Sequence, residues 1–256
     1  MKDYINISKL SFLNVFNDLS FSIDKNKIIG IASPSSQGKT LLCKILDKKI
    51  IYKGNILINN KNIKDYKINE YYNMIDVIIP NNISFRYDTL NDNIIRYKRK
   101  DNLKEYNKLI KNLHLKNILD KKINELNIDE VILIQIFISL ISDKEIIILD
   151  DIYSYLDNNL YKEIILLLKS YTKNKTIIIQ SNKLKYFDLL DYIYILSNSK
   201  IILEGIPKDV LLNDNILSKI GLELPFVIDL SVKLIDYNLL DELTFSSEEV
   251  IDKIWK

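Results

Sequence analysis

Three consecutive residues, Gly38, Lys39 and Thr40, have the chemistry that binding a polyphosphate requires. They end residues 33–40, which match the pattern G-x-x-x-x-G-K-[ST] at every fixed position except the first, where Ser33 replaces glycine. In such a loop, backbone N–H groups surround the phosphates, the lysine neutralises the β and γ phosphates, and the hydroxyl ligates magnesium. The residues predicted to bind the phosphates are Ser33, Ser35, Ser36, Gln37, Gly38, Lys39 and Thr40.

A second group with suitable chemistry, Asp150, follows the apolar run Ile-Ile-Ile-Leu at residues 146–149. Such a run is typical of a buried strand, whose tip presents the carboxylate to a metal ion. An ordinary core strand with acids at its exposed end would give the same pattern. That alternative does not explain the phosphate loop upstream. We therefore predict that Thr40 and Asp150 ligate one Mg²⁺ ion.

The elements that must position these groups alternate in type. Residues 28–32 predict a strand buried on both faces, and residues 39–46 predict a helix, so the loop has the strand–loop–helix context that it needs. A mainly helical stretch covers residues 90–140. Other strands are predicted at residues 5–10, 19–23, 54–58, 146–149, 176–179, 192–196 and 200–203, and helices at 159–170 and 184–190. This alternation predicts an α/β fold with a mainly parallel sheet covered by helices.

Composition excludes several classes of function. A net charge of +2 is too small to indicate a nucleic-acid partner. Single cysteine and histidine residues, Cys43 and His114, exclude an internal disulfide and a Cys/His metal cluster, and Cys43 is expected to be buried on a helix. Residues 131–142 are the most apolar stretch but are shorter than the ~20 residues of a membrane span. We expect no signal peptide in residues 1–9.

Taken in order, these and other segments resemble the ATP-binding cassette (ABC) ATPases. Counting from Asp150, the family signature falls on residues 126–130 and the D-loop pattern S-x-L-D on residues 154–157. The tail of the glutamine loop, the switch segment and the pattern G-K-I-x-x-E-G-x-P fall on residues 89–94, 177–182 and 200–207. The resemblance covers about residues 3–210. It implies a P-loop NTPase fold with ATP and Mg²⁺ as cofactors.

The resemblance also implies three catalytic positions, and the sequence departs from the family at each. Asp151 takes the place of the general-base glutamate, Asn182 that of the switch histidine, and either Pro80 or Asn81 that of the sensing glutamine. Hydrolysis needs a base positioned against water. Asp151 is one methylene shorter than glutamate, and Asn182 cannot take up a proton at neutral pH. We therefore expect reduced or absent hydrolysis.

Two further residue assignments follow from the resemblance. Asp129 and Glu130 lie in the signature, which in a family dimer faces the partner's ATP, and their charge would repel a phosphate unless the loop turns away. Phe12 is the candidate for stacking on adenine, although a core position explains it at least as well.

The C-terminal residues make the resemblance specific to one group of ABC ATPases. Residues 216–227 and 244–250 are similar to the C-terminal extension of energy-coupling factor (ECF) transporter ATPases, with a generic helical cap as the alternative. We expect an ABC nucleotide-binding domain at residues 1–207, with an inserted helical subdomain at about 82–145. A small helical extension at residues 208–256 would follow, with Pro207 at the boundary.

The resemblance implies the ATP-binding subunit of an ECF-type importer, peripheral to the cytoplasmic face of the membrane. Its partners would be a transmembrane transporter subunit, gripped near residues 81–87, and a second ABC ATPase in a homo- or heterodimer. The alternative is a catalytically weak or inactive subunit that acts as a scaffold or regulator. Ribosome-associated ABC proteins usually carry two tandem cassettes, and an iron–sulfur assembly protein would not need the residues after Pro207.

Overall fold

The computed structural model describes residues 3–83 and 85–254 of the chain. Its strands are β1 (Ile5–Phe12), β2 (Phe16–Ile23), β3 (Ile28–Ala32), β4 (Lys53–Ile58), β5 (Lys61–Asn62), β6 (Ile75–Ile78), β7 (Ile146–Asp150), β8 (Thr176–Ser181), β9 (Tyr192–Ser197) and β10 (Lys200–Gly205). Its α-helices are α1 (Lys39–Leu46), α2 (Ile68–Met74), α3 (Leu90–Ile94), α4 (Leu103–Asn112), α5 (Ile128–Ile141), α6 (Asn158–Ser170), α7 (Pro207–Leu211), α8 (Asp214–Lys219), α9 (Phe226–Asp236) and α10 (Ser247–Ile254).

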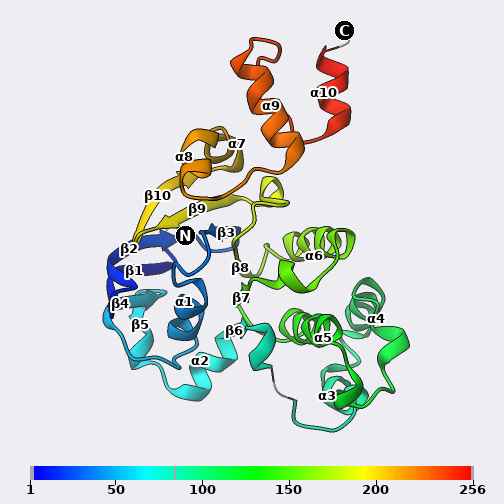
Figure 1. Ribbon diagram of the computed structural model, residues 1–256. Helices are drawn as coiled ribbons and strands as arrows, with labels where there is room; N and C mark the ends of the chain where they lie inside the picture. The colour runs from blue at the N-terminus through cyan, green and yellow to red at the C-terminus, as the bar shows by residue number, and fades with distance from the viewer. Residues whose placement is uncertain (1–2, 84, 255–256) are drawn as a thin grey trace.

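Two sheets form the framework of the molecule (Figure 1). The larger has the order β10-β9-β3-β8-β7-β6, in which β9, β3, β8, β7 and β6 are mutually parallel and β10 pairs antiparallel with β9. The smaller has the order β2-β1-β4-β5, and all its pairs are antiparallel. The carboxyl ends of β3, β7 and β8 therefore lie side by side, and ligands bind at this edge of parallel sheets.

Helix α1 lies between the two sheets (Figure 1). Its buried residues Leu42, Cys43 and Ile45 pack in one core cluster with side chains of both sheets. Strands β3 and β7, which both lie inside the large sheet, are buried at every position, as their unbroken apolar runs predict. Cys43 is fully buried, as expected. This packing fixes the start of α1 against the ends of β3 and β7.

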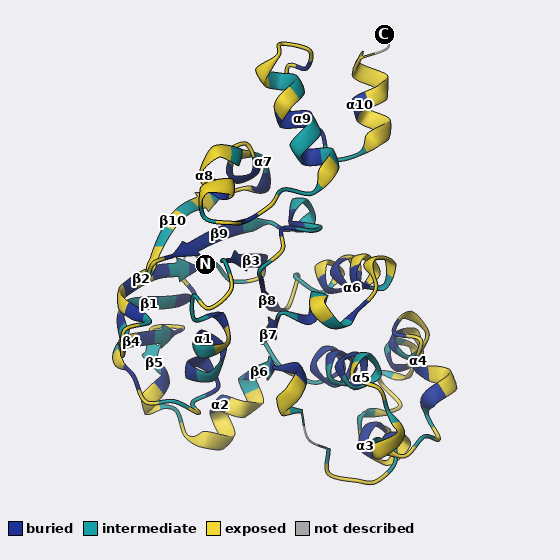
Figure 2. Ribbon diagram, in the orientation of Figure 1, coloured by how far each residue is buried: buried dark blue, intermediate teal, exposed yellow. Residues whose placement is uncertain are grey.

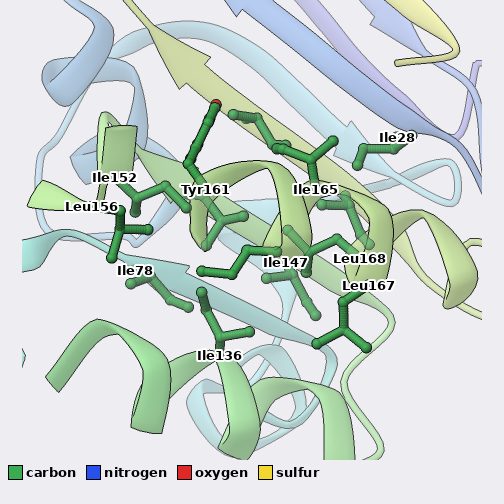
Figure 3. Close-up of a cluster of buried hydrophobic side chains, with 14 of the residues drawn as sticks. Ile28, Ile78, Ile136, Ile147, Ile152, Leu156, Tyr161, Ile165, Leu167 and Leu168 are labelled. Carbon is green, nitrogen blue, oxygen red and sulfur yellow. The ribbon is translucent and has the colours of Figure 1, made fainter. Parts of the chain in front are cut away.

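The other face of the large sheet packs against helices α5 and α6 (Figure 3). Ile147 of β7, Ile136 of α5 and Ile165 of α6 belong to the same core cluster. Helix α6 begins at a cap in which the Asp157 side chain accepts from the N–H groups of Asn159 and Leu160. Helix α5 is apolar on nearly all sides and buries nine residues, so the apolar residues 131–138 serve a core helix.

The C-terminal residues form helices α7 to α10, which extend from the edge of the large sheet (Figure 1). Several of their side chains, among them Leu217, Ile228 and Val232, are buried in the cluster that holds α5 and α6 (Figure 2). Within the described ranges, none of the helices combines the length and apolar character of a bilayer span.

The α/β fold predicted from the sequence is confirmed, with three differences in detail. The predicted strands exist, but the antiparallel pairs of β1, β2, β4 and β5 form a separate sheet. Strand β6 was not predicted, although it pairs with β7 in the large sheet. The helix predicted at residues 184–190 is wrong. Only a short 3₁₀ turn, Phe187–Leu189, forms there, and it starts after Tyr186 in the left-handed region.

Candidate nucleotide-binding site

A cavity of about 370 Å³ opens where the phosphate loop meets the ends of β7 and β8. Its lining residues are Val15, Ser35, Ser36, Gly38, Lys39, Thr40, Leu41, Asp150, Asp151 and Asn182. Most of the residues predicted to bind phosphate and magnesium therefore lie around one space. Ser33 and Gln37 do not line it, and they support the loop from outside instead.

Gly38 sets the path of the phosphate loop into α1. Its φ of 88° lies in the left-handed region, which favours glycine. A Cβ atom built on it would lie 2.5 Å from Cγ1 of Val15 and 2.8 Å from Cζ of Phe16. The backbone can therefore turn here only without a side chain. No side chain among the described residues caps α1, so its first N–H groups remain available to an anion.

Lys39 is held inside the loop that it closes. It is 8% exposed, and its Nζ donates to the backbone oxygens of Ser33 at 2.7 Å and Pro34 at 3.0 Å, and to Ser33 Oγ at 3.0 Å. Burial lowers the pKa of this ammonium, and the carboxylates of Asp151 and Asp150 oppose that shift. The cation is thus already fixed beside the cavity, where it can exchange carbonyl oxygens for phosphate oxygens.

Ser33 and Gln37 tie the loop to neighbouring strands. The Ser33 N–H donates to the backbone oxygen of Ser181 at the end of β8, at 3.2 Å. The Gln37 side-chain oxygen accepts from the N–H of Asn198, between β9 and β10, at 3.0 Å. These residues therefore act on the shape of the loop.

Asp150 has the environment of a metal ligand. It is 4% exposed, and its Oδ1 atom has no hydrogen-bond partner among the described residues. Burial raises the pKa of its carboxyl and the Asp151 charge adds to the shift, whereas the nearby Thr40 side chain opposes it. An unmet buried carboxylate oxygen beside a hydroxyl is a set of donors that suits Mg²⁺.

The described residues of the cavity include only two acidic side chains, Asp150 and Asp151, and no histidine. Among the described residues, no three His, Cys, Asp or Glu side chains gather closely enough to form a metal site by themselves. Magnesium commonly uses one or two protein ligands together with phosphates and water. Thr40 and Asp150 fit that arrangement.

Two of the three predicted catalytic residues line the cavity. The Asp151 carboxylate accepts from the hydroxyls of Ser154 at 3.0 Å and Ser181 at 3.4 Å, so both its oxygens are engaged. Asp151 itself has a φ of 47°. The Asn182 amide donates to Ser35 Oγ at 3.4 Å, across the mouth of the loop.

The third predicted catalytic residue, Asn81, does not line the cavity. It is exposed in the 3₁₀ turn Pro80–Asn82, and its amide donates to the hydroxyl of Tyr155 at 3.1 Å. Pro80 is buried and has no polar side chain. The sensing position is therefore outside this site in the arrangement that the structure shows.

The negative charge at the family signature is smaller than the acidic residues Asp129 and Glu130 alone indicate. Glu130 accepts from the ammonium of Lys121 at 2.7 Å and from the N–H of Asn127 at 3.0 Å, so its charge is paired within the chain and caps α5. Lys121 thus offsets part of the negative charge of Glu130, and repulsion of a partner's phosphate by the signature stays a prediction.

The structure places Phe12, the candidate for stacking on adenine, outside the cavity lining. Phe12 is partly buried, packs against the core cluster around α1 and is not among the lining residues. Val15 and Leu41 line the cavity instead, and neither was predicted. No sequence pattern marks Val15, because it depends on the turn between β1 and β2 folding over Gly38.

Comparisons with known proteins agree with this geometry. The family model described as ABC transporter matches residues 16–154, more than half of the chain. The zinc import ATP-binding protein ZnuC of Ehrlichia chaffeensis is 29% identical over 223 residues, which cover 83% of this chain and 88% of that protein. The energy-coupling factor transporter ATP-binding protein EcfA of Malacoplasma penetrans is 27% identical over 254 residues, covering 95% and 88%.

Solved structures show the same fold. CbiO1 from Clostridium perfringens, described as part of the ABC transporter complex cbiONQ, aligns with a TM-score of 0.71 at 18% identity, over 92% of this chain and 100% of that one. A bacterial Atm1-family ABC exporter with ATP bound aligns with a TM-score of 0.73 at 19% identity, over 84% and 41%. The chain therefore belongs to the ABC transporter family and is an ATP-binding subunit of a transporter.

Proposed function

We propose that the chain binds magnesium–ATP in the cavity between the phosphate loop and Asp150, and that this binding energises an ECF-type importer. The observation that carries the proposal is the arrangement of Lys39, Thr40 and Asp150 around one space. The buried ammonium of Lys39 and the start of α1, which no described side chain caps, can bind a polyphosphate. Asp150 Oδ1, which has no hydrogen-bond partner among the described residues, can bind its metal ion.

The C-terminal helices support the ECF type. The similarity to EcfA extends over 95% of the chain, whereas the similarity to ZnuC covers 83%. Buried hydrogen bonds tie α9 to the segment that precedes α10: Ser231 Oγ accepts from the Thr244 N–H at 2.9 Å and lies 3.1 Å from Thr244 Oγ1. The C-terminal residues thus form specific buried contacts with one another.

The proposed partners are a transmembrane transporter subunit and a second ABC ATPase, with the chain peripheral to the cytoplasmic face of the membrane. The segment beside Asn81 is exposed and suits such a contact, since Asn81, Arg86 and Tyr87 all present accessible side chains. This chain's own site would turn over slowly, because Asp151 is engaged by two hydroxyls and Asn81 lies elsewhere.

The alternative is a scaffold in which nucleotide only stabilises assembly, and Asp151 separates the two proposals. We would measure the ATPase rate of the complex reconstituted with its membrane subunit and second ATPase, using the wild-type chain, Asp151→Asn and Asp151→Glu. An energising role predicts a lower rate for Asp151→Asn and a higher one for Asp151→Glu, which restores the missing methylene. Equal rates for all three chains would support the scaffold.

A further inference from the structure

The amide of Gln180 is the feature of the fold that the proposed site leaves unexplained. Gln180 lies near the end of β8 and is 0% exposed. Neither its Nε2 nor its Oε1 has a hydrogen-bond partner among the described residues. An unmet buried amide destabilises a fold, so its presence at a ligand-binding edge needs a reason.

Asp150 is the direct neighbour of Gln180 across the sheet. The two residues are paired in the parallel register of β7 and β8. Two positions earlier, Ile148 and Ile178 both belong to the core cluster beneath α1, and side chains alternate along a strand. Asp150 and Gln180 therefore both face α1, on strands that lie about 4.8 Å apart.

The two side chains have complementary unmet atoms. Within residues 3–83 and 85–254, the buried Asp150 Oδ1 has no hydrogen-bond partner, and neither does the buried N–H donor of Gln180. Burial raises the pKa of Asp150, and an N–H donor favours the charged form of a carboxylate. Gln180 does not line the cavity, whereas Asp150 does, so the amide can act on a bound ligand only through Asp150.

We infer that Gln180 is a positioning residue, whose amide donates to Asp150 Oδ1 when the site is loaded and holds the carboxylate with its other oxygen toward the metal. This inference rests on the proposed magnesium–ATP site. Partners of this kind around a metal ligand fix its orientation, and their loss commonly lowers metal affinity 10- to 100-fold. A core glutamine without this role would have no effect on magnesium.

The test uses the purified full chain with ATP as the probe, in EDTA and over a series of free Mg²⁺ concentrations. Gln180→Met replaces the amide with an apolar chain of similar length, and Gln180→Glu keeps the length but removes the donor. Ile178→Met is the matched control, on the same face of the same strand. Calorimetry gives ATP affinity, and thermal unfolding without Mg²⁺ gives the stability of the free chain.

We expect Gln180→Met to leave ATP affinity in EDTA unchanged and to raise the Mg²⁺ concentration for half-maximal tightening about tenfold. Its midpoint of thermal unfolding should equal or exceed that of the wild type, since an unmet amide is removed. On an Asp150→Asn background, Gln180→Met should have no further effect on Mg²⁺. Ile178→Met should retain the wild-type Mg²⁺ requirement.

Two outcomes overturn the inference alone: an unchanged Mg²⁺ requirement in Gln180→Met, or an equal loss of ATP affinity with and without Mg²⁺, which indicates a structural role. Failure of the wild-type chain to bind ATP under any condition overturns the proposed function and this inference together.

Discussion

The ammonium of Lys39 donates to the carbonyl oxygen of Ser33, 2.7 Å away, although these residues bracket a loop predicted to surround phosphate. The loop's own oxygens thus take the place that phosphate oxygens would occupy. A polyphosphate oxygen carries negative charge, whereas a carbonyl oxygen is neutral, so a polyphosphate can compete for this cation. The position of Lys39 is therefore set before any ligand arrives.

Gly38 offers a direct test of how the loop is built. Gly38→Ala should lower the free energy of unfolding by about 2 kcal/mol or more, because alanine meets both a left-handed backbone and Val15 Cγ1 at 2.5 Å. Denaturant unfolding measures this change. Gly221→Ala is the matched control, since Gly221 also has a positive φ, but no atom of the described part of the chain lies within 4 Å of the added Cβ.

A Val15→Ala background separates the two causes in Gly38→Ala. Removing the Val15 methyl groups should recover the part of the loss due to the clash with Val15 and leave the backbone strain together with the contact to Phe16. Equal losses for Gly38→Ala and Gly221→Ala would show that the contact with Val15 has no energetic role.

Lys175 should give stability a dependence on pH. It is 7% exposed, and its Nζ donates to the carbonyl oxygens of Ser142 and Lys144. Burial lowers the pKa of its ammonium to about 8. Between pH 8 and 10 the unfolded chain holds a proton that the folded chain has lost, so stability rises with pH. Below pH 8 both the folded and the unfolded chain hold this proton, so the stabilisation gained at higher pH is lost.

The measurement compares unfolding free energies of the wild type and Lys175→Met between pH 8 and 10. Their difference should change by about 2 kcal/mol in favour of the wild type as pH rises. Lys173→Met, which removes an exposed lysine two residues earlier, should follow the wild type. A constant difference for Lys175→Met would contradict the lowered pKa.

The hydrogen bonds between Ser231 of α9 and Thr244, just before α10, should stabilise the C-terminal extension. Ser231→Ala leaves the buried N–H and hydroxyl of Thr244 without their partner, which costs about 1–3 kcal/mol. Hydrogen exchange should therefore accelerate in α9 and α10 and stay unchanged in β3 and β7. Ser218→Ala, at an exposed position of α8, provides the comparison. Unchanged exchange in Ser231→Ala would exclude this role.

Much of the fold was predictable because its strands carry strong apolar runs. Residues 28–32 and 146–149 predicted buried strands, and the Gly-Lys-Thr run predicted the start of α1 at Lys39. Strand β6 was missed because Asp76 interrupts its run, and in the structure Asp76 accepts from Gln135 and Ser139 of α5. These donors lie about 60 residues away in the sequence, so no local sequence pattern around Asp76 indicates a strand.

The site residues that belong to a sequence motif were predictable, whereas those placed by tertiary packing were not. Lys39, Thr40 and Asp150 follow from a motif and a strand end. Val15 reaches the cavity because the turn between β1 and β2 folds over Gly38, and Asn81 lies outside the cavity, where it bonds to Tyr155. Gln180 is visible only once the register of β7 and β8 is known.

The most direct test of the central claim is calorimetric titration of the purified chain with ATP, with and without Mg²⁺. The wild type should bind, and Lys39→Ala should weaken binding in both conditions by about 1.5–3 kcal/mol, as expected for loss of a hydrogen bond from a charged group. Asp150→Asn should weaken binding only with Mg²⁺. Absence of binding by the wild type, or equal affinities for wild type and Lys39→Ala, would contradict a nucleotide site between Lys39 and Asp150.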